Sequence, residues 1–133
     1  MFKNKTAILS GVSIVILMFA ISGCYKTTTL VVNPGSNITV EQSFAKDITP
    51  IFDKSCALSG CHMSGAKSPD LSSGNAYKSL NDGRYFIAGD PDNSVLIFWL
   101  TGKKFPAMPM GTGLNQEINA KVYAWIKQGA KNN

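Results

Sequence analysis

The sequence has few of the residue types that carry most enzyme chemistry. It contains one histidine, His62, one arginine, Arg84, and three cysteines. No nucleophile stands beside a base in a known motif, and no paired carboxylates suggest acid–base catalysis. We therefore expect no enzyme activity of the chain's own and no small-molecule substrate.

Dense positive charge and internal repeats are also lacking. The formal net charge is +5, and the longest basic run is the pair Lys103 and Lys104. Nucleic-acid-binding proteins concentrate lysine and arginine on one face, so a nucleic-acid partner is not indicated. A length of 133 residues suggests one domain.

The longest apolar run lies near the N-terminus, over residues 7–21. Two lysines precede it, and small residues separate it from Cys24. A basic start, a short apolar run and a small-residue exit are typical of a secretory signal. The run is also short for a spanning helix. We predict a signal peptide over residues 1–23.

The end of this signal resembles the bacterial lipobox, on the motif Ile21-Ser22-Gly23-Cys24. The resemblance implies that Cys24 carries diacylglycerol and becomes an acylated N-terminus. Its alternatives are an uncleaved anchor or an ordinary signal with a chance cysteine. Residues 24–40 then form the lipidated cysteine and a flexible tether. We expect a cell-envelope protein, lipid-anchored to a membrane and facing the periplasm.

Residues 41–133 carry the pattern of a small all-α domain, and no strand pattern competes there. In the first helix Thr49 is expected to cap and Pro50 to take the first helical position. The third helix begins with the similar pair Asp90 and Pro91. The helices are predicted near residues 49–56, near 75–80, from Asp90 to about Gly102, and from Asn115 to about Gly129.

The last of these helices has the clearest signal. Asn115 is a good N-cap, and Gly129 is suited to close the helix. Apolar residues follow at helical spacing and define one buried face. These residues are Ile118, Val122, Trp125 and Ile126.

One short motif carries the strongest functional signal. If Cys24 is lipidated, Cys56 and Cys61 remain, and His62 directly follows the second. Two neighbouring thiols can reach the two vinyl groups of a haem, and the imidazole that follows can bind its iron. The usual spacing is Cys-x-x-Cys-His, whereas four residues intervene here, with Ser59-Gly60 able to bulge away. The motif predicts one covalently bound haem c.

The same residues allow two other interpretations. An exported chain meets an oxidising environment, where Cys56 and Cys61 can form a disulfide. Cysteine and histidine also bind zinc, although zinc usually takes four ligands and no further histidine or unlipidated cysteine exists. Local spacing alone leaves both alternatives open.

A second iron ligand is expected from the loop before the last helix. Its two methionines, Met108 and Met110, lie among prolines and glycines. A thioether ligand raises the iron potential and suits reversible electron transfer. Met108 is favoured because Ala107 and Pro109 flank it, and Met110 is the alternative. Met63, next to His62, is poorly placed to reach the opposite haem face.

Taken in order, these segments resemble class I c-type cytochrome domains of bacterial lipoproteins. The resemblance covers roughly residues 47–130. It rests on the segment 47–52 leading into the Cys/Cys-His motif, on 89–96, on Met108-Pro109 and on 125–130.

The resemblance implies a cytochrome c-like helical fold around one haem, in which the closing helix crosses the first near its start. Cys56 and Cys61 would carry the thioethers, His62 would be proximal and Met108 distal. The four-residue spacer departs from the family pattern.

The expected function is that of a monohaem c-type cytochrome lipoprotein. It would carry single electrons between redox partner proteins at the periplasmic face of a membrane. Two alternatives are a haem subunit of a larger membrane redox complex and a disulfide-stapled lipoprotein without haem.

Overall fold

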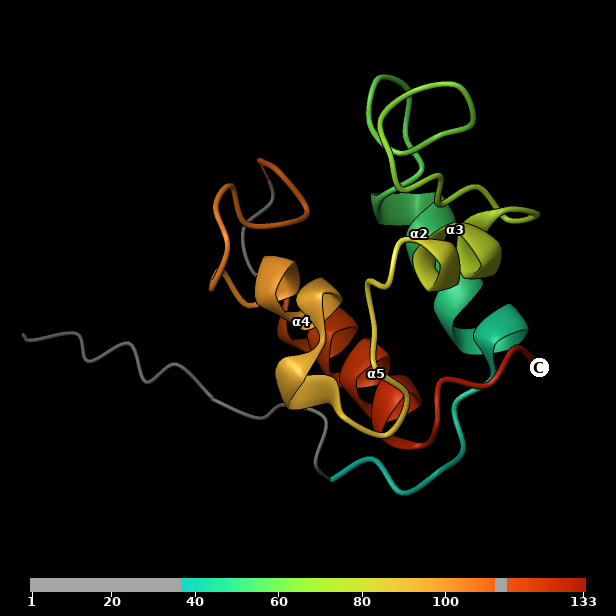
Figure 1. Cartoon of the computed structure of the whole chain (residues 1–133), viewed down its shortest axis with the longest axis vertical. Helices are drawn as coiled ribbons and strands as arrows, with labels where there is room; N and C mark the ends of the chain where they lie inside the picture. Colours follow the sequence, from blue (N-terminus) through green and yellow to red (C-terminus); the bar gives the residue numbers. More distant parts are fainter. Residues whose placement is uncertain (1–36, 112–114) are drawn as a thin grey trace, which may run out of the picture. The chain divides into compact units, whose positions relative to one another are not determined.

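Helices are the regular secondary structure of residues 37–111 and 115–133, the parts of the chain that the computed structural model describes (Figure 1). These residues contain no strand, which confirms the all-α prediction. The elements are η1 Phe44–Ile48, α2 Thr49–Ser55, α3 Ala76–Asp82, η2 Pro91–Asn93, α4 Val95–Leu100 and α5 Gln116–Lys127.

The expected signal peptide of residues 1–23, Cys24 and most of the tether lie outside the described residues. Within the two described segments, no helix is long and apolar enough to cross a bilayer.

The first predicted helix begins earlier than expected, and the prediction that Thr49 caps it is wrong. The π-helical turn η1 runs directly into α2, so Thr49 lies inside a continuous helical stretch and its hydroxyl donates to the Phe44 carbonyl at 3.0 Å. The cap is Ser43, whose hydroxyl accepts from the Lys46 N–H at 3.2 Å. Pro50 lies in the first turn of α2.

The third predicted helix is divided in two at Ser94. Asp90 caps only the short 3-10 turn η2, and Ser94 is extended, with ψ of 125°, before α4 begins. The fully buried Ser94 hydroxyl accepts from the Ile87 N–H at 2.9 Å and donates to the Asp90 carbonyl at 2.8 Å. These bonds satisfy a buried polar group at the cost of helical continuity. The helix then ends before Gly102, as predicted.

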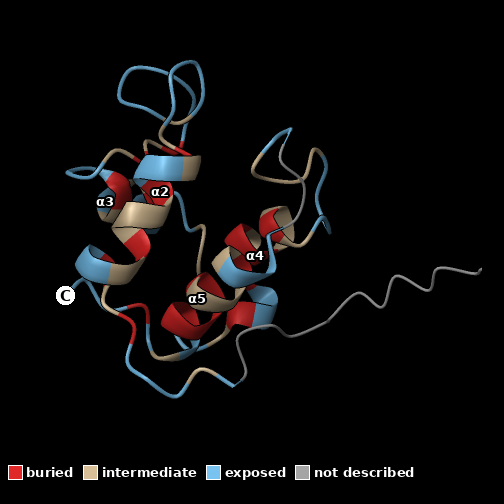
Figure 2. Ribbon diagram, turned by 180° about the vertical axis from the view of Figure 1, so that it is seen from behind, coloured by how far each residue is buried: buried red, intermediate tan, exposed pale blue. Residues whose placement is uncertain are grey.

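The last helix, α5, agrees with its prediction. Asn115 caps it by accepting from the Ile118 N–H at 3.0 Å. Val122, Trp125 and Ile126 are almost fully buried, and Figure 2 shows the buried residues of α4 and α5 in red.

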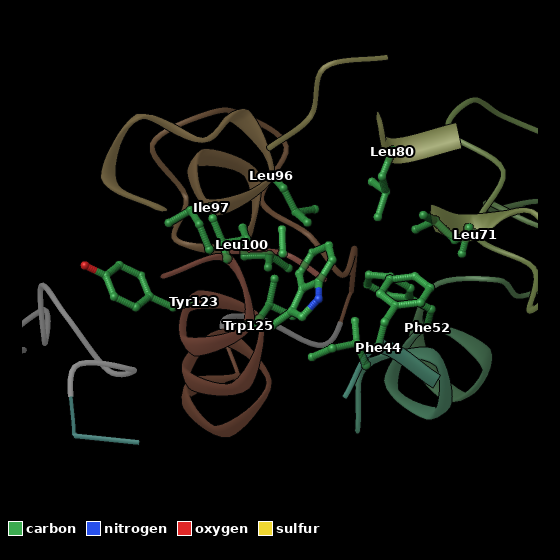
Figure 3. Packing of buried hydrophobic residues seen from close by; sticks show 14 of the residues in the cluster. Phe44, Phe52, Leu71, Leu80, Leu96, Ile97, Leu100, Tyr123 and Trp125 are labelled. Atoms are coloured by element: carbon green, nitrogen blue, oxygen red, sulfur yellow. The ribbon is translucent and has the colours of Figure 1, made fainter. Parts of the chain in front are cut away.

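Trp125 lies at the centre of an aromatic cluster that joins α5 to the first half of the domain. Its ring centroid is 5.2 Å from that of Phe44 and 5.0 Å from that of Phe86. Phe44 also lies 5.2 Å from Tyr77 of α3. The closing helix therefore packs on η1, directly before α2, and Figure 3 shows Trp125 between the leucines of α4 and the phenylalanines of η1 and α2.

Candidate functional site

The two thiols of the motif lie in different surroundings at the end of α2. Cys56 is the C-cap residue, buried against the core, and its N–H donates to the Phe52 carbonyl at 2.8 Å. Cys61 is exposed, and both side chains are free thiols. One thiol is thus fixed by the helix and the core, while the other is presented at the surface.

The four-residue spacer forms a turn of its own. The Cys61 N–H donates to the Leu58 carbonyl at 2.9 Å, and Gly60 has φ of +76°, a conformation that glycine adopts without strain. The His62 N–H then donates to the Cys56 carbonyl at 3.1 Å. The extra residues therefore bulge into a turn, and the histidine backbone returns to the end of α2.

Backbone carbonyls orient the imidazole of His62. Its Nδ1 lies 3.0 Å from the Pro69 carbonyl and 3.2 Å from the Lys67 carbonyl. The His62 carbonyl in turn accepts from the N–H of Leu71, a core residue, at 2.7 Å. Backbone and ring are thus both held by the returning segment 67–71.

These contacts select one tautomer of the neutral ring. A carbonyl oxygen only accepts, so Nδ1 carries the proton and donates it. Nε2 is then left with its lone pair, which is the form in which imidazole binds a metal. Metal-ligating histidines commonly donate their other N–H to a carbonyl in this manner.

Asp70 stabilises the segment that supplies these carbonyls. Its carboxylate accepts from the hydroxyl and the N–H of Ser72 and from the Asn75 side chain at the start of α3. The Ser72 hydroxyl, followed by the Ser72 N–H, lowers the pKa of Asp70 below its ordinary value. The carboxylate therefore stays charged and keeps the segment in place.

Burial controls the chemistry of the Cys56 thiol. Burial, and to a smaller extent charge on the neighbouring Cys61, together raise the pKa of Cys56 from 9.0 to about 11. Because the thiolate is the reactive form, Cys56 is protonated and unreactive near neutral pH.

In protein whose two thiols are both free, we expect iodoacetamide to alkylate Cys61 well before Cys56. Modification of Cys56 should accelerate as pH rises toward about 11, where its thiolate forms. The raised pKa also means that the stability gained by burying the neutral thiol is present below pH about 9 and is lost as pH approaches 11. Peptide mass spectrometry over a pH series measures both sites, and equal rates at pH 7 would contradict the burial of Cys56.

Met108 is held against α4 by its backbone. Its N–H donates to the Trp99 carbonyl at 2.9 Å, and its side chain packs against the core cluster. Met110 is 62% exposed, and Met63 is 40% exposed. Of the three methionines, Met108 is therefore the one with a fixed backbone and a partly buried side chain.

The structure brings Cys56 and Met108 to the same apolar cluster. Cys56 belongs to it, Met108 packs on it, and His62 is linked to it through Leu71. Figure 3 shows Leu80 and Leu96 of this cluster coming from opposite sides above Trp125. The predicted ligands thus adjoin an apolar environment, although the described residues contain no group of three or more His, Cys, Asp or Glu side chains suited to a metal ion.

Sequence reasoning missed the partners of His62. Pro69 and Lys67 act through backbone carbonyls, which leave no signature in side-chain chemistry. Asp70 followed by Ser72 does carry a signal, because aspartate commonly accepts from the backbone two residues later. No family model, curated protein or solved structure matches the chain.

Proposed function

We propose that the chain is a monohaem c-type cytochrome lipoprotein that carries single electrons at the periplasmic face of a membrane. The observation that carries the proposal is the orientation of His62. Its Nδ1 is engaged by the carbonyls of Pro69 and Lys67, so Nε2 is available directly after the paired thiols.

The donor set fits a haem c group. Cys56 and Cys61 are the free thiols that thioether attachment requires, and His62 and Met108 offer the nitrogen and sulfur ligands of an electron-transfer haem. A haem bound here would supply one-electron chemistry at its iron. The chain's own residues would hold these ligands: the Pro69 and Lys67 carbonyls orient His62, and the Trp99 carbonyl holds the backbone of Met108.

A cytochrome c-like arrangement is the finer fold that we propose. It is supported by the order of the elements, with a helix entering the motif, a middle helix, a methionine loop and a closing helix. The packing of α5 on η1, immediately before α2, supports it as well.

The proposal is tested on protein purified from the envelope of cells that express a haem-attachment apparatus. We expect haem staining that survives denaturing electrophoresis. The intact mass should equal that of residues 24–133 plus one haem and the lipid on Cys24. Colourless protein that lacks the two thiol hydrogens of Cys56 and Cys61 would instead identify a disulfide-stapled lipoprotein. A native mass well above the monomer would identify a subunit of a larger redox complex.

The distal ligand is tested by two matched substitutions. Met108→Leu should abolish the sulfur–iron charge-transfer band of the oxidised protein, because Leu keeps the volume and removes the thioether. Met110→Leu should leave the band intact, since Met110 is largely exposed. Absorption spectra of the two variants decide the assignment, and the opposite result would transfer the ligand role to Met110.

A further inference from the structure

The loop that carries Met108 presents an unusual tip. Phe105 is 91% exposed, the largest value among the exposed large apolar residues of the described chain, and Met110 in the same loop is 62% exposed. Lys103 and Lys104 directly precede Phe105. A single exposed apolar side chain is ordinary, so the surroundings of Phe105 decide whether it has a role.

Backbone hydrogen bonds hold this tip away from the core. The Lys104 N–H donates to the Phe98 carbonyl at 3.0 Å, and the Met108 N–H donates to the Trp99 carbonyl at 2.9 Å. Both carbonyls belong to the last turn of α4, so the base of the loop is fixed on both sides of Phe105. Figure 1 shows this loop, in orange, projecting beyond α4.

The sequence on both sides of the tip carries charge of one sign. No aspartate or glutamate occurs between Asp92 and Glu117. Neither loop lysine forms an ion pair within the described chain, and each instead lies over an aromatic ring, with Lys103 Nζ 5.2 Å from the Phe98 centroid and Lys104 Nζ 5.5 Å from that of Trp99. The lysines therefore leave their positive charge available to an external anion.

We propose that this tip, defined as Lys103, Lys104 and Phe105, docks on an anionic lipid surface. Lysines attract anionic headgroups, and an adjacent phenylalanine can bury its ring among the upper acyl chains. A stable protein interface buries about 1,600 Å², far more than one loop tip offers. A lipid surface has no such requirement, because it accepts a single side chain.

The docking rests on the membrane tether of the proposed function but not on the haem. Residues 25–40 span at most about 55 Å when extended, which keeps the domain close to its membrane. A tethered domain experiences a high effective concentration of the surface, so a weak contact is sufficient to orient it. The contact would turn the Met108 side of the domain toward the lipid.

Hydrogen exchange of full-chain protein in lipid nanodiscs tests the proposal. One set of discs contains phosphatidylcholine alone, and the other adds phosphatidylglycerol. We expect amides of residues 102–111 to exchange more slowly only in the anionic discs, and added salt should remove the protection. Removing the charge with Lys104→Gln should weaken docking about fivefold. Phe105→Ala should weaken docking about tenfold.

Two substitutions elsewhere on the surface serve as controls. Ile87→Ala removes a different exposed apolar side chain, and Lys54→Gln removes a different exposed lysine. Neither should alter the protection of residues 102–111.

Equal exchange in both kinds of disc would overturn the proposal, as would failure of the chain to stay in the disc. Protection that grows with the number of chains per disc would point to contact between copies. Protection that needs an added acidic protein would point to a protein partner. Both of these results overturn lipid docking, whereas haem staining of the same samples reports separately on the proposed function.

Discussion

His62→Ala is expected to remove most of the haem that we propose the protein binds. The substitution removes the nitrogen ligand and also the ring that the Pro69 and Lys67 carbonyls hold in place. Because the proposed haem is attached covalently through Cys56 and Cys61, the loss acts at attachment. Without the imidazole to hold the iron while the thioethers form, the haem-bearing fraction should fall about tenfold or more. Haem absorbance per mole of chain measures the effect.

Met63, the residue that follows the proposed ligand His62, provides the matched control. Met63→Ala changes an exposed neighbour on the same loop and should leave the haem content unchanged. Any haem that His62→Ala retains should regain its original absorption spectrum on addition of imidazole, which can occupy the vacant position. Unchanged haem content and spectrum in His62→Ala would remove His62 from the site.

Trp125→Ala should be the most destabilising single substitution in the core. Trp125 is 1% exposed, contacts the rings of Phe44, Tyr77 and Phe86, and donates through Nε1 to the Lys131 carbonyl at 2.9 Å. Truncation of a buried aromatic side chain to alanine costs about 3–5 kcal/mol. Small domains have only about 5–15 kcal/mol of stability in total, so a large part of it would be lost.

Denaturant unfolding followed by circular dichroism measures this loss. Phe105→Ala is the control, because it truncates an aromatic residue that is 91% exposed and should shift the free energy of unfolding by less than about 0.5 kcal/mol. Similar stabilities of the two variants would show that the aromatic cluster does not hold α5 to η1.

The helices could be predicted where one residue carries a local signal. Asn115 begins α5 through its own side chain, and the apolar spacing marks the buried face of that helix. The break at Ser94 could not be predicted, because the backbone groups of Ile87 and Asp90 that bind its hydroxyl leave no signature in side-chain chemistry. Asp90-Pro91 correctly indicated a helical start, but the hydrogen bonds of Ser94 to Ile87 and Asp90 limited it to one short turn.

The candidate site divides in the same way. The thiols and the imidazole could be predicted as site residues from the sequence, because their side chains carry the chemistry and lie close together in the chain. The tautomer of His62 could not be predicted from the sequence, because it depends on the backbone carbonyls of Pro69 and Lys67. The preference for Met108 over Met110 as ligand rests on the flanking residues and stays a prediction, and the structure adds that the Met108 N–H donates to the Trp99 carbonyl.

The hydrogen-bonded base of the loop that carries Met108 allows the position of Met108 and the surface chemistry of the tip to change separately. Met108 and Lys104 are attached to α4 through main-chain groups, which any amino acid except proline provides equally well. The side chains of Lys104 and Phe105 can therefore be exchanged while the backbone of Met108 keeps its place. The affinity of the tip for a lipid surface can therefore be changed, by design or by evolution, without altering the redox centre that we propose.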